Sequence, residues 1–383
     1  MSVTAARGFR AAGVTAGLKA SGTSDVALVV NDGPGNAAAA VFTTNRCKAN
    51  PVLWSEQVVS DGRVAAVILN SGGANCYTGP QGFQTTHRTA ERVASLLDTA
   101  TADIAVCSTG LIGDQLDVDR LLAGVDAAHS AMSSDGGLDA AVAIMTTDTV
   151  AKESVVRGDG WVVGGMAKGA GMLAPALATM LVVITTDADV DPATCDKSLR
   201  EATRVTFDRL DSDGCMSTND TVLLMASGAS GVAPDPQAFP DALQAVCLDL
   251  ARQLLADAEG AKHDVTIEVT GAANESDAVE VGRAVARSNL LKCAIYGEDP
   301  NWGRVLAAVG TTQAAFEPHD VDVVFNGVAV CRGGEPGDAR ELVTFDGRPV
   351  RIVVDLHAGA ETAIIWTNDL TVDYVHENSA YST

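Results

Sequence analysis

One uncharged stretch of the sequence places a threonine where it could act as a nucleophile. Residues 169–186 carry no charge, and within them Thr179 follows the small-residue run "PALA" and precedes the β-branched run "MLVVI". A small-residue run can bend tightly, and a β-branched run favours a strand that would hold the threonine in place. Taken alone, the segment is more typical of a threonine in a core strand than of a nucleophile.

A threonine hydroxyl becomes reactive near neutral pH only if a base lies beside it. The threonine's own α-amine, with a pKa of about 8, supplies that base if the preceding bond is cut. Attack of Thr179 Oγ on the carbonyl of Ala178, followed by hydrolysis of the ester, would release this amine. Lys168 is the cation nearest to this bond along the sequence, and its ammonium could hold a carboxylate. The hypothesis is a self-cleaving chain with an N-terminal threonine nucleophile.

Other interpretations of this stretch fit less well. "GAGMLA" (169–174) matches a relaxed dinucleotide-binding glycine motif, but Pro175 interrupts the crossover helix that such a motif must open. The uncharged length is at the lower limit for a membrane span, yet glycines, a proline and threonines make it weakly apolar, and Asp187 follows at once. None of the six histidines lies in a core motif of the chain, so a Ser-His-Asp hydrolase has no support.

The overall charge and the cysteines limit the classes of function. A net charge of -23 disfavours binding to nucleic acid or to an anionic membrane, because phosphate contacts need a basic patch. The eight cysteines include no Cys-x-x-Cys pair, which argues against a metal site and favours reduced thiols. The N-terminal residues have no apolar run of signal-peptide length, so we expect a cytoplasmic protein.

Strand-like and helix-like segments alternate along the chain, which predicts the α/β class. The strand-like runs of the first half are residues 25–30, 63–70, 103–110, 161–165 and 180–187, and the clearest helical periodicities cover 85–98 and 240–260. A further unit is expected after Lys262, with strands at 263–272, 321–330 and 351–359 and one helix over 275–295. The stretch 226–240 is rich in Gly, Pro, Ala and Ser and predicts a surface loop.

Seven motifs, in this order along the chain, resemble the ornithine acetyltransferase family of arginine biosynthesis, the bifunctional glutamate N-acetyltransferases. They are "STGLIG" (108–113), "IMTTDT" (144–149), "MAKGAGMLAPALATMLVVITTD" (166–187), "TFDRLDSDGCMSTNDT" (206–221), "DAEGAK" (257–262), "EDPNWGRVLAAVG" (298–310) and "YVHENSAYST" (374–383). The resemblance runs from "GFRAAGVTAG" near the start to Thr383. Seven motifs in order over nearly the whole chain make the resemblance specific to this family.

The resemblance implies a fold and a division of the chain. The fold is a layered αββα sandwich of the α/β (α+β) kind with an N-terminal-nucleophile site, followed by a smaller C-terminal α/β unit. The main catalytic unit would span residues 1–262, the smaller unit 263–370, and a tail 371–383 would return to the active site. Cleavage between Ala178 and Thr179 would give chains 1–178 and 179–383.

The resemblance also implies a reaction and its residues. Acetyl would pass from N2-acetylornithine to Thr179 and then to glutamate, giving ornithine and N-acetylglutamate in the cyclic arginine pathway. Thr109 and Gly110 would form the oxyanion hole. The substrate-binding residues would be Thr146, Lys168, Thr179, Glu259, Asn378 and Thr383.

The implied partners are small molecules and the protein's own fragments. We expect no cofactor and no metal, with acetyl-coenzyme A left open as a second acetyl donor. The family suggests an assembly of two copies of each fragment. Two alternatives remain: an N-terminal-nucleophile amidohydrolase or aminopeptidase of related fold, which would use water as acceptor, and an unprocessed binding protein.

Overall fold

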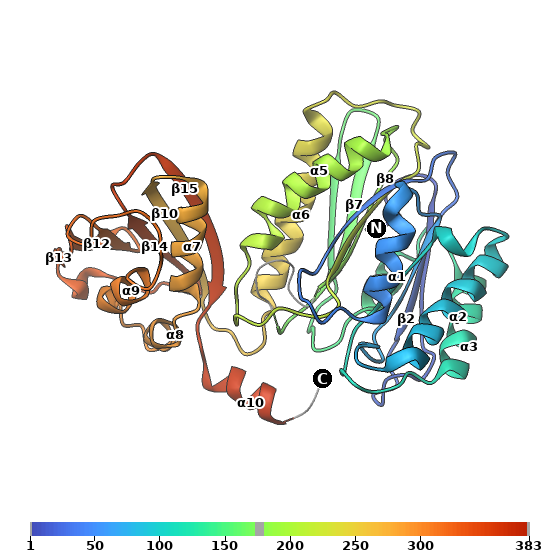
Figure 1. The fold of residues 1–383 in the computed structure, drawn as a ribbon, viewed down its shortest axis with the longest axis horizontal. Coiled ribbons are helices and arrows are strands. Elements are labelled where there is room, and N and C mark those ends of the chain that lie inside the picture. The colour runs from blue at the N-terminus through green and yellow to red at the C-terminus, as the bar shows by residue number, and fades with distance from the viewer. Residues whose placement is uncertain (1, 173–179, 381–383) are drawn as a thin grey trace.

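The computed structural model describes residues 2–172 and 180–380, which form three β-sheets with helices packed on them (Figure 1). Ala178, Thr179 and Thr383 lie outside the described residues. All eight cysteines are free thiols, five of them buried and three exposed. None of the helices in the described part of the chain has the length and apolar content needed to cross a membrane.

The first sheet, sheet A, has the strand order β1-β2-β4-β5, in which β4 and β5 run parallel and the other pairs are antiparallel. Its strands are β1 (Phe9–Val14), β2 (Val26–Asn31), β4 (Ala66–Asn70) and β5 (Ile104–Ser108). Every residue of β4 and β5 is buried, which explains why both strands have nearly continuous apolar sequences. The predicted strands at 25–30, 63–70 and 103–110 are therefore confirmed, with ends that differ by at most three residues.

The second sheet, sheet B, contains the strands on both sides of the uncharged stretch. Its order is β3-β9-β8-β7-β6, with β8 and β9 parallel. The strands are β3 (Ala37–Phe42), β6 (Lys152–Arg157), β7 (Val162–Lys168), β8 (Leu181–Thr186) and β9 (Thr221–Ala226). The run "LVVITT" is thus the central strand of the sheet and is wholly buried.

Three layers of apolar side chains show that sheets A and B are stacked face to face between helices. One face of sheet A packs on sheet B, as when Val67 and Leu69 share a core with Leu181 and Val183. The opposite face of sheet A packs on helices α2 (Gly79–Leu97) and α3 (Val118–Ala131), and the opposite face of sheet B packs on α5 (Pro192–Val205) and α6 (Ala238–Ala256). This arrangement confirms the αββα sandwich (Figure 1).

All but the last of the described helices are amphipathic or short and pack on an apolar face of a sheet or on a neighbouring helix, whereas the last has no buried residue. They are α1 (Asn50–Val58), α2 (Gly79–Leu97), α3 (Val118–Ala131), α4 (Gly137–Ala143), α5 (Pro192–Val205), α6 (Ala238–Ala256), α7 (Glu275–Ala286), α8 (Asn289–Tyr296), α9 (Trp302–Val309) and α10 (Val372–Ala380). Short 3-10 turns lie at Val59–Asp61, Thr101–Asp103, Phe207–Arg209 and Arg340–Leu342.

The third sheet, sheet C, forms the C-terminal unit, seen at the left of Figure 1. Its order is β13-β12-β11-β14-β10-β15. The strands are β10 (Asp264–Ala272), β11 (Asp322–Phe325), β12 (Val328–Arg332), β13 (Glu335–Pro336), β14 (Pro349–Asp355) and β15 (Glu361–Asn368). Apolar residues of the strands pack against α7, α8 and α9. From the end of β15 the chain continues into α10, which lies between this unit and the two-sheet unit (Figure 1).

The prediction of one helix in this unit is wrong. The sequence predicted a single helix over 275–295, but the structure has two helices, α7 and α8. Ser288 begins the second helix, because its Oγ accepts a hydrogen bond from the backbone N–H of Leu291 at 3.3 Å. An N-cap of this kind lets the chain change direction without leaving the first helical N–H groups unpaired.

Candidate active site

Every predicted site residue that the structure describes lies on one cavity. The cavity is also lined by residues 217–219 and by the loop that follows β7. The six predicted residues on it are Thr109, Gly110, Thr146, Lys168, Glu259 and Asn378. They come from widely separated parts of the sequence, and the fold brings them together on the cavity.

Thr109 and Gly110 directly follow the last residue of β5. Thr109 is buried, and its backbone N–H donates to the carbonyl of Asn70 at 3.0 Å, which continues the pairing of β4 with β5. Gly110 has φ +129°, and a Cβ there would lie 2.9 Å from the backbone of Gly73. Only glycine fits this close approach without displacing the neighbouring loop. The sheet therefore fixes a hydroxyl and an adjacent backbone N–H at the cavity.

Lys168 is the last residue of β7 and pairs with Leu181, the first residue of β8. Its side chain is only 1% exposed, and Nζ donates to Thr109 Oγ1 at 3.3 Å. Burial lowers the pKa of Lys168, an effect that the negative charge of Asp148 partly offsets. Because the ammonium donates to the oxygen of Thr109, the hydroxyl proton of Thr109 is free to point elsewhere.

Asp148 organises the neighbourhood of Lys168, although the sequence analysis did not select it. Its Oδ1 accepts the backbone N–H of Gly169 and the ammonium of Lys152, each at 2.6 Å, and its Oδ2 accepts the backbone N–H of Thr146 at 3.0 Å. Burial would raise the pKa of Asp148, but Lys168, Lys152 and the N–H of Gly169 together hold it below its usual value. No local pattern signals this role, because an Asp side chain that closes a turn accepts the N–H two residues after it, whereas Asp148 accepts the N–H of Thr146, two residues before it.

Glu259 and Asn378 form the opposite side of the cavity. The backbone N–H of Glu259 donates to the carbonyl of Ala170 at 2.9 Å, and a Cβ on Gly171 would lie 2.6 Å from the Glu259 carboxylate. On α10, Asn378 donates through Nδ2 to Glu259 Oε2 at 2.9 Å. The carboxylate is thus held between the loop after β7 and the C-terminal helix.

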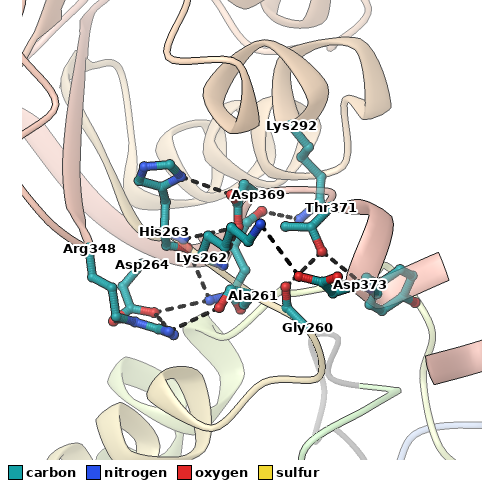
Figure 2. Close-up of polar contacts among 12 residues, drawn as sticks. Gly260, Ala261, Lys262, His263, Asp264, Lys292, Arg348, Asp369, Thr371 and Asp373 are labelled. Carbon is teal, nitrogen blue, oxygen red and sulfur yellow. Dashed lines mark hydrogen bonds and ion pairs between the residues drawn. The ribbon is translucent and has the colours of Figure 1, made fainter. Parts of the chain in front are cut away.

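A polar junction holds α10 at its beginning, where the chain segments entering and leaving sheet C meet (Figure 2). The buried carboxylate of Asp369 accepts the backbone N–H groups of Lys262 and His263 at 2.9 and 3.0 Å, and it contacts the ring Nδ1 of His263 at 2.8 Å. Thr371 donates its hydroxyl to the carbonyl of Gly260 at 2.7 Å, as Figure 2 shows. The residue that follows Glu259 is therefore tied directly to the start of α10.

Within residues 2–172 and 180–380, no group of three or more His, Cys, Asp and Glu side chains is placed to hold a metal ion. The described residues of the cavity can act through hydrogen bonds and charge. A hydroxyl and a backbone N–H can stabilise an oxyanion, a buried ammonium can hold a carboxylate, and a carboxylate can attract a cation.

Comparison with known proteins identifies the family. A model of the ArgJ family matches residues 10–383. This chain belongs to the ArgJ family.

Similar proteins cover the whole chain. The "Arginine biosynthesis bifunctional protein ArgJ" of Streptomyces coelicolor is 66% identical over 383 residues and covers 100% of both chains. The protein of the same name in Thermobifida fusca is 64% identical over the same coverage. Its namesake in Mycobacterium tuberculosis is 55% identical over 391 residues, which span 100% of this chain and 96% of that protein.

Two solved structures match parts of the chain. The ornithine acetyltransferase of Mycobacterium tuberculosis, complexed with ornithine, is 57% identical and covers 47% of this chain and 96% of the solved chain, with a TM-score of 0.45. The arginine biosynthesis bifunctional protein ArgJ of Bacillus halodurans is 39% identical and covers 51% of this chain and 97% of its own, with a TM-score of 0.49.

Proposed function

We propose that this ArgJ-family chain moves an acetyl group from N2-acetylornithine to glutamate, with Thr179 as the intermediate carrier. The chain is an acyltransferase of arginine biosynthesis, as its family membership and its relatives over the full length indicate. The observation that carries the mechanism is the single cavity lined by all six described site residues. That cavity is bordered by Lys168, whose strand partner Leu181 lies two residues after Thr179.

In the first half-reaction, Thr179 Oγ attacks the acetyl carbonyl carbon of N2-acetylornithine. The hydroxyl proton passes to the α-amine of Thr179 and from there to the leaving nitrogen, so that ornithine departs and an acetyl ester remains. The negative oxygen of the tetrahedral intermediate would accept hydrogen bonds from the hydroxyl of Thr109 and the N–H of Gly110. The Lys168 ammonium donates to the Thr109 oxygen, which leaves the Thr109 hydroxyl hydrogen available to donate to the oxyanion.

In the second half-reaction, the amine of glutamate attacks the acetyl ester, and the same two donors serve the second oxyanion. Threonine Oγ leaves with a proton returned by its own amine, which had taken one from the attacking nitrogen. Donor and acceptor share an α-carboxylate, so one cation can serve both. Lys168 fits this role because its buried ammonium lines the cavity, where a charge-assisted hydrogen bond to a carboxylate is strong.

The remaining site residues would recognise the rest of the substrate. The Glu259 carboxylate is suited to the δ-ammonium of ornithine, and Asn378 keeps that carboxylate in place at 2.9 Å. Thr146 and Thr383 would complete the substrate contacts. Asp148 supports Thr146 through the backbone hydrogen bond at 3.0 Å.

Self-cleavage between Ala178 and Thr179 would create the nucleophile and leave fragments 1–178 and 179–383. In this proposal the catalytic unit spans 1–262, the smaller unit 263–370, and the tail 371–383 completes the site. The proposed enzyme is cytoplasmic, contains two copies of each fragment and uses no cofactor. Acetyl-coenzyme A is a candidate second donor, which would let the enzyme start the pathway as well as recycle acetyl.

The test is an exchange assay with N2-acetylornithine and isotopically labelled glutamate. We expect labelled N-acetylglutamate and free ornithine in equal amounts, with parallel lines in double-reciprocal plots because the two substrates react in turn. Thr179→Ala should abolish exchange, whereas the control Thr344→Ala, at an exposed threonine of the C-terminal unit, should leave it unchanged. Release of acetate without N-acetylglutamate would instead support the hydrolase alternative.

A further inference from the structure

The segment "STNDT" (217–221) lies between the loop of Thr109 and Gly110 and the start of β8, and the proposed reaction assigns it no role. Its first three residues line the cavity, and its last residue begins β9. Strand β9 runs parallel to β8, with Thr221 opposite Leu181. The segment therefore reaches the loop that contains Thr109 and Gly110, here called the oxyanion loop, on one side. On the other side it reaches the start of β8, here called the nucleophile strand because it follows Thr179.

Asn219 holds the oxyanion loop. Its side-chain Nδ2 donates to the carbonyl of Ser108 at 2.8 Å and to the carbonyl of Ala74 at 2.6 Å. Ser108 directly precedes Thr109, and the N–H of Ala74 donates to the carbonyl of Leu111 at 2.9 Å. One buried amide thus fixes the chain just before the two oxyanion donors and, through Ala74, just after them.

Asp220 holds the start of the nucleophile strand. Its Oδ1 accepts the backbone N–H of Met180 at 3.0 Å, and the neighbouring N–H of Thr221 donates to the carbonyl of Met180 at 3.2 Å. Both backbone polar groups of the residue joined to Thr179 are therefore bound by residues 220 and 221. The Asp220 side chain is completely buried.

We propose that Asn219 and Asp220 are positioning residues of the acyl-transfer site, with Asn219 fixing the loop of Thr109 and Gly110 and Asp220 fixing the chain directly after the bond to be cut. The inference rests on the proposed function, because it gives the pair a purpose only if Thr179 is the nucleophile. Two adjacent residues directly before β9 set the distance between the nucleophile strand and the oxyanion donors. A displacement of either by about 1 Å can cost about 100-fold in rate.

The second oxygen of Asp220 makes the proposal testable with a conservative variant. This Oδ2 is buried and has no hydrogen-bond partner among the described residues. Burial raises the pKa of Asp220 well above its usual range, and the Met180 N–H, the Ser217 hydroxyl and the charge of Lys168 oppose this rise only in part. A neutral carboxyl has one acceptor oxygen and one O–H donor, and an asparagine side chain reproduces both in nearly the same shape.

The experiment compares Asn219→Ala, Asp220→Ala and Asp220→Asn with the wild type in three measurements. These are the time course of self-cleavage, kcat and KM of acetyl exchange per cleaved chain, and the thermal midpoint of unfolding. For the two alanine variants we expect cleavage and kcat to fall by about 100-fold, with KM changed by less than about threefold, because the reacting groups lose their mutual position. Asp220→Asn should cleave and turn over within about threefold of the wild type, because Met180 keeps its acceptor.

Asp187→Ala is the matched control for the loss of a buried carboxylate. Asp187 follows the other end of β8, is 1% exposed, and accepts the backbone N–H of Val162 at 2.7 Å and that of Arg7 at 3.3 Å. We expect this variant to lower the thermal midpoint about as much as Asp220→Ala while cleavage and kcat per folded chain stay at the wild-type values.

Three results would overturn the proposal: wild-type kcat in both alanine variants, an equal loss of kcat in Asp187→Ala, or Asp220→Asn as slow as Asp220→Ala. A wild-type chain that neither cleaves nor exchanges acetyl would instead overturn the proposed function. The wild-type measurement therefore separates the two failures.

Discussion

The two sides of the cavity are built in different ways. On one side Thr109, Lys168 and Asn219 are at most 4% exposed and lie at or beside the ends of strands of sheets A and B. On the other side Glu259 is half-buried in a turn, and Asn378 is exposed on α10, a helix with no buried residue. We infer that the buried side performs the chemistry, which needs fixed geometry, and that the exposed side selects the substrate.

This difference predicts which kinetic constant each variant changes. A group that acts on the transition state alone lowers kcat when it is removed, whereas a group that binds substrate and transition state equally raises KM. Variants of the buried side should therefore lower kcat or, at Lys168, raise KM strongly, and variants of the exposed side should raise KM by smaller factors.

Thr109→Ala should have the largest effect among the residues that surround the nucleophile. Loss of one oxyanion donor typically lowers kcat by about 100- to 1000-fold. The same site can serve cleavage of the Ala178–Thr179 bond, so processing should slow as well, which gel analysis of freshly made protein would measure. Normal processing in this variant would show that cleavage and transfer use different oxyanion donors.

Lys168→Met should have the next largest effect. Loss of a charge-assisted hydrogen bond to the substrate carboxylate should lower kcat/KM by about 10- to 100-fold, mainly through KM. Steady-state kinetics with N2-acetylornithine and with glutamate should show similar losses, because one cation serves both carboxylates. A loss confined to one substrate would contradict the shared role.

The pH dependence of KM tests the same ammonium without a mutation. Burial lowers the pKa of Lys168 from its usual value near ~10.4. The cation is present below its pKa and is lost as the pH rises through it, so KM should increase about tenfold per pH unit above that value. Lys168→Arg should remove this rise, because a guanidinium stays charged. A KM that is constant up to the pKa of an exposed lysine would contradict the assignment.

Asn378→Ala should have the smallest effect. It removes one hydrogen bond to Glu259, at 2.9 Å, and should raise KM for N2-acetylornithine by about fivefold with kcat nearly unchanged. Deletion of residues 378–383 should raise KM further. An unchanged KM after that deletion would show that the C-terminal residues do not contribute to the site.

Local sequence patterns predicted the strands well, because central strands such as "LVVITT" are apolar on both faces and leave few alternatives. They failed at 275–295, where the periodicity of α7 and α8 continues across the Ser288 cap. The site residues came from the family resemblance, since nothing in the periodicity distinguishes Thr109 from a residue in an ordinary turn.

The supporting residues Asp148, Asn219 and Asp220 were not selected, because their roles depend on contacts that local sequence does not encode. Asn219 bonds Ser108, which is 111 residues away, and Asp220 bonds Met180, which is 40 residues away. A buried carboxylate and a buried amide are recognisable only once the fold has placed their partners beside them.

Intact-mass spectrometry of the freshly purified protein tests the central claim most directly. We predict two polypeptides, residues 1–178 and 179–383, and a gain of one acetyl group on the second, at Thr179, after brief mixing with N2-acetylornithine. Thr179→Ala should remain one chain of 383 residues and stay unacetylated. A wild-type chain that remains uncut after prolonged incubation, or an acetyl group found on another residue, would contradict the account.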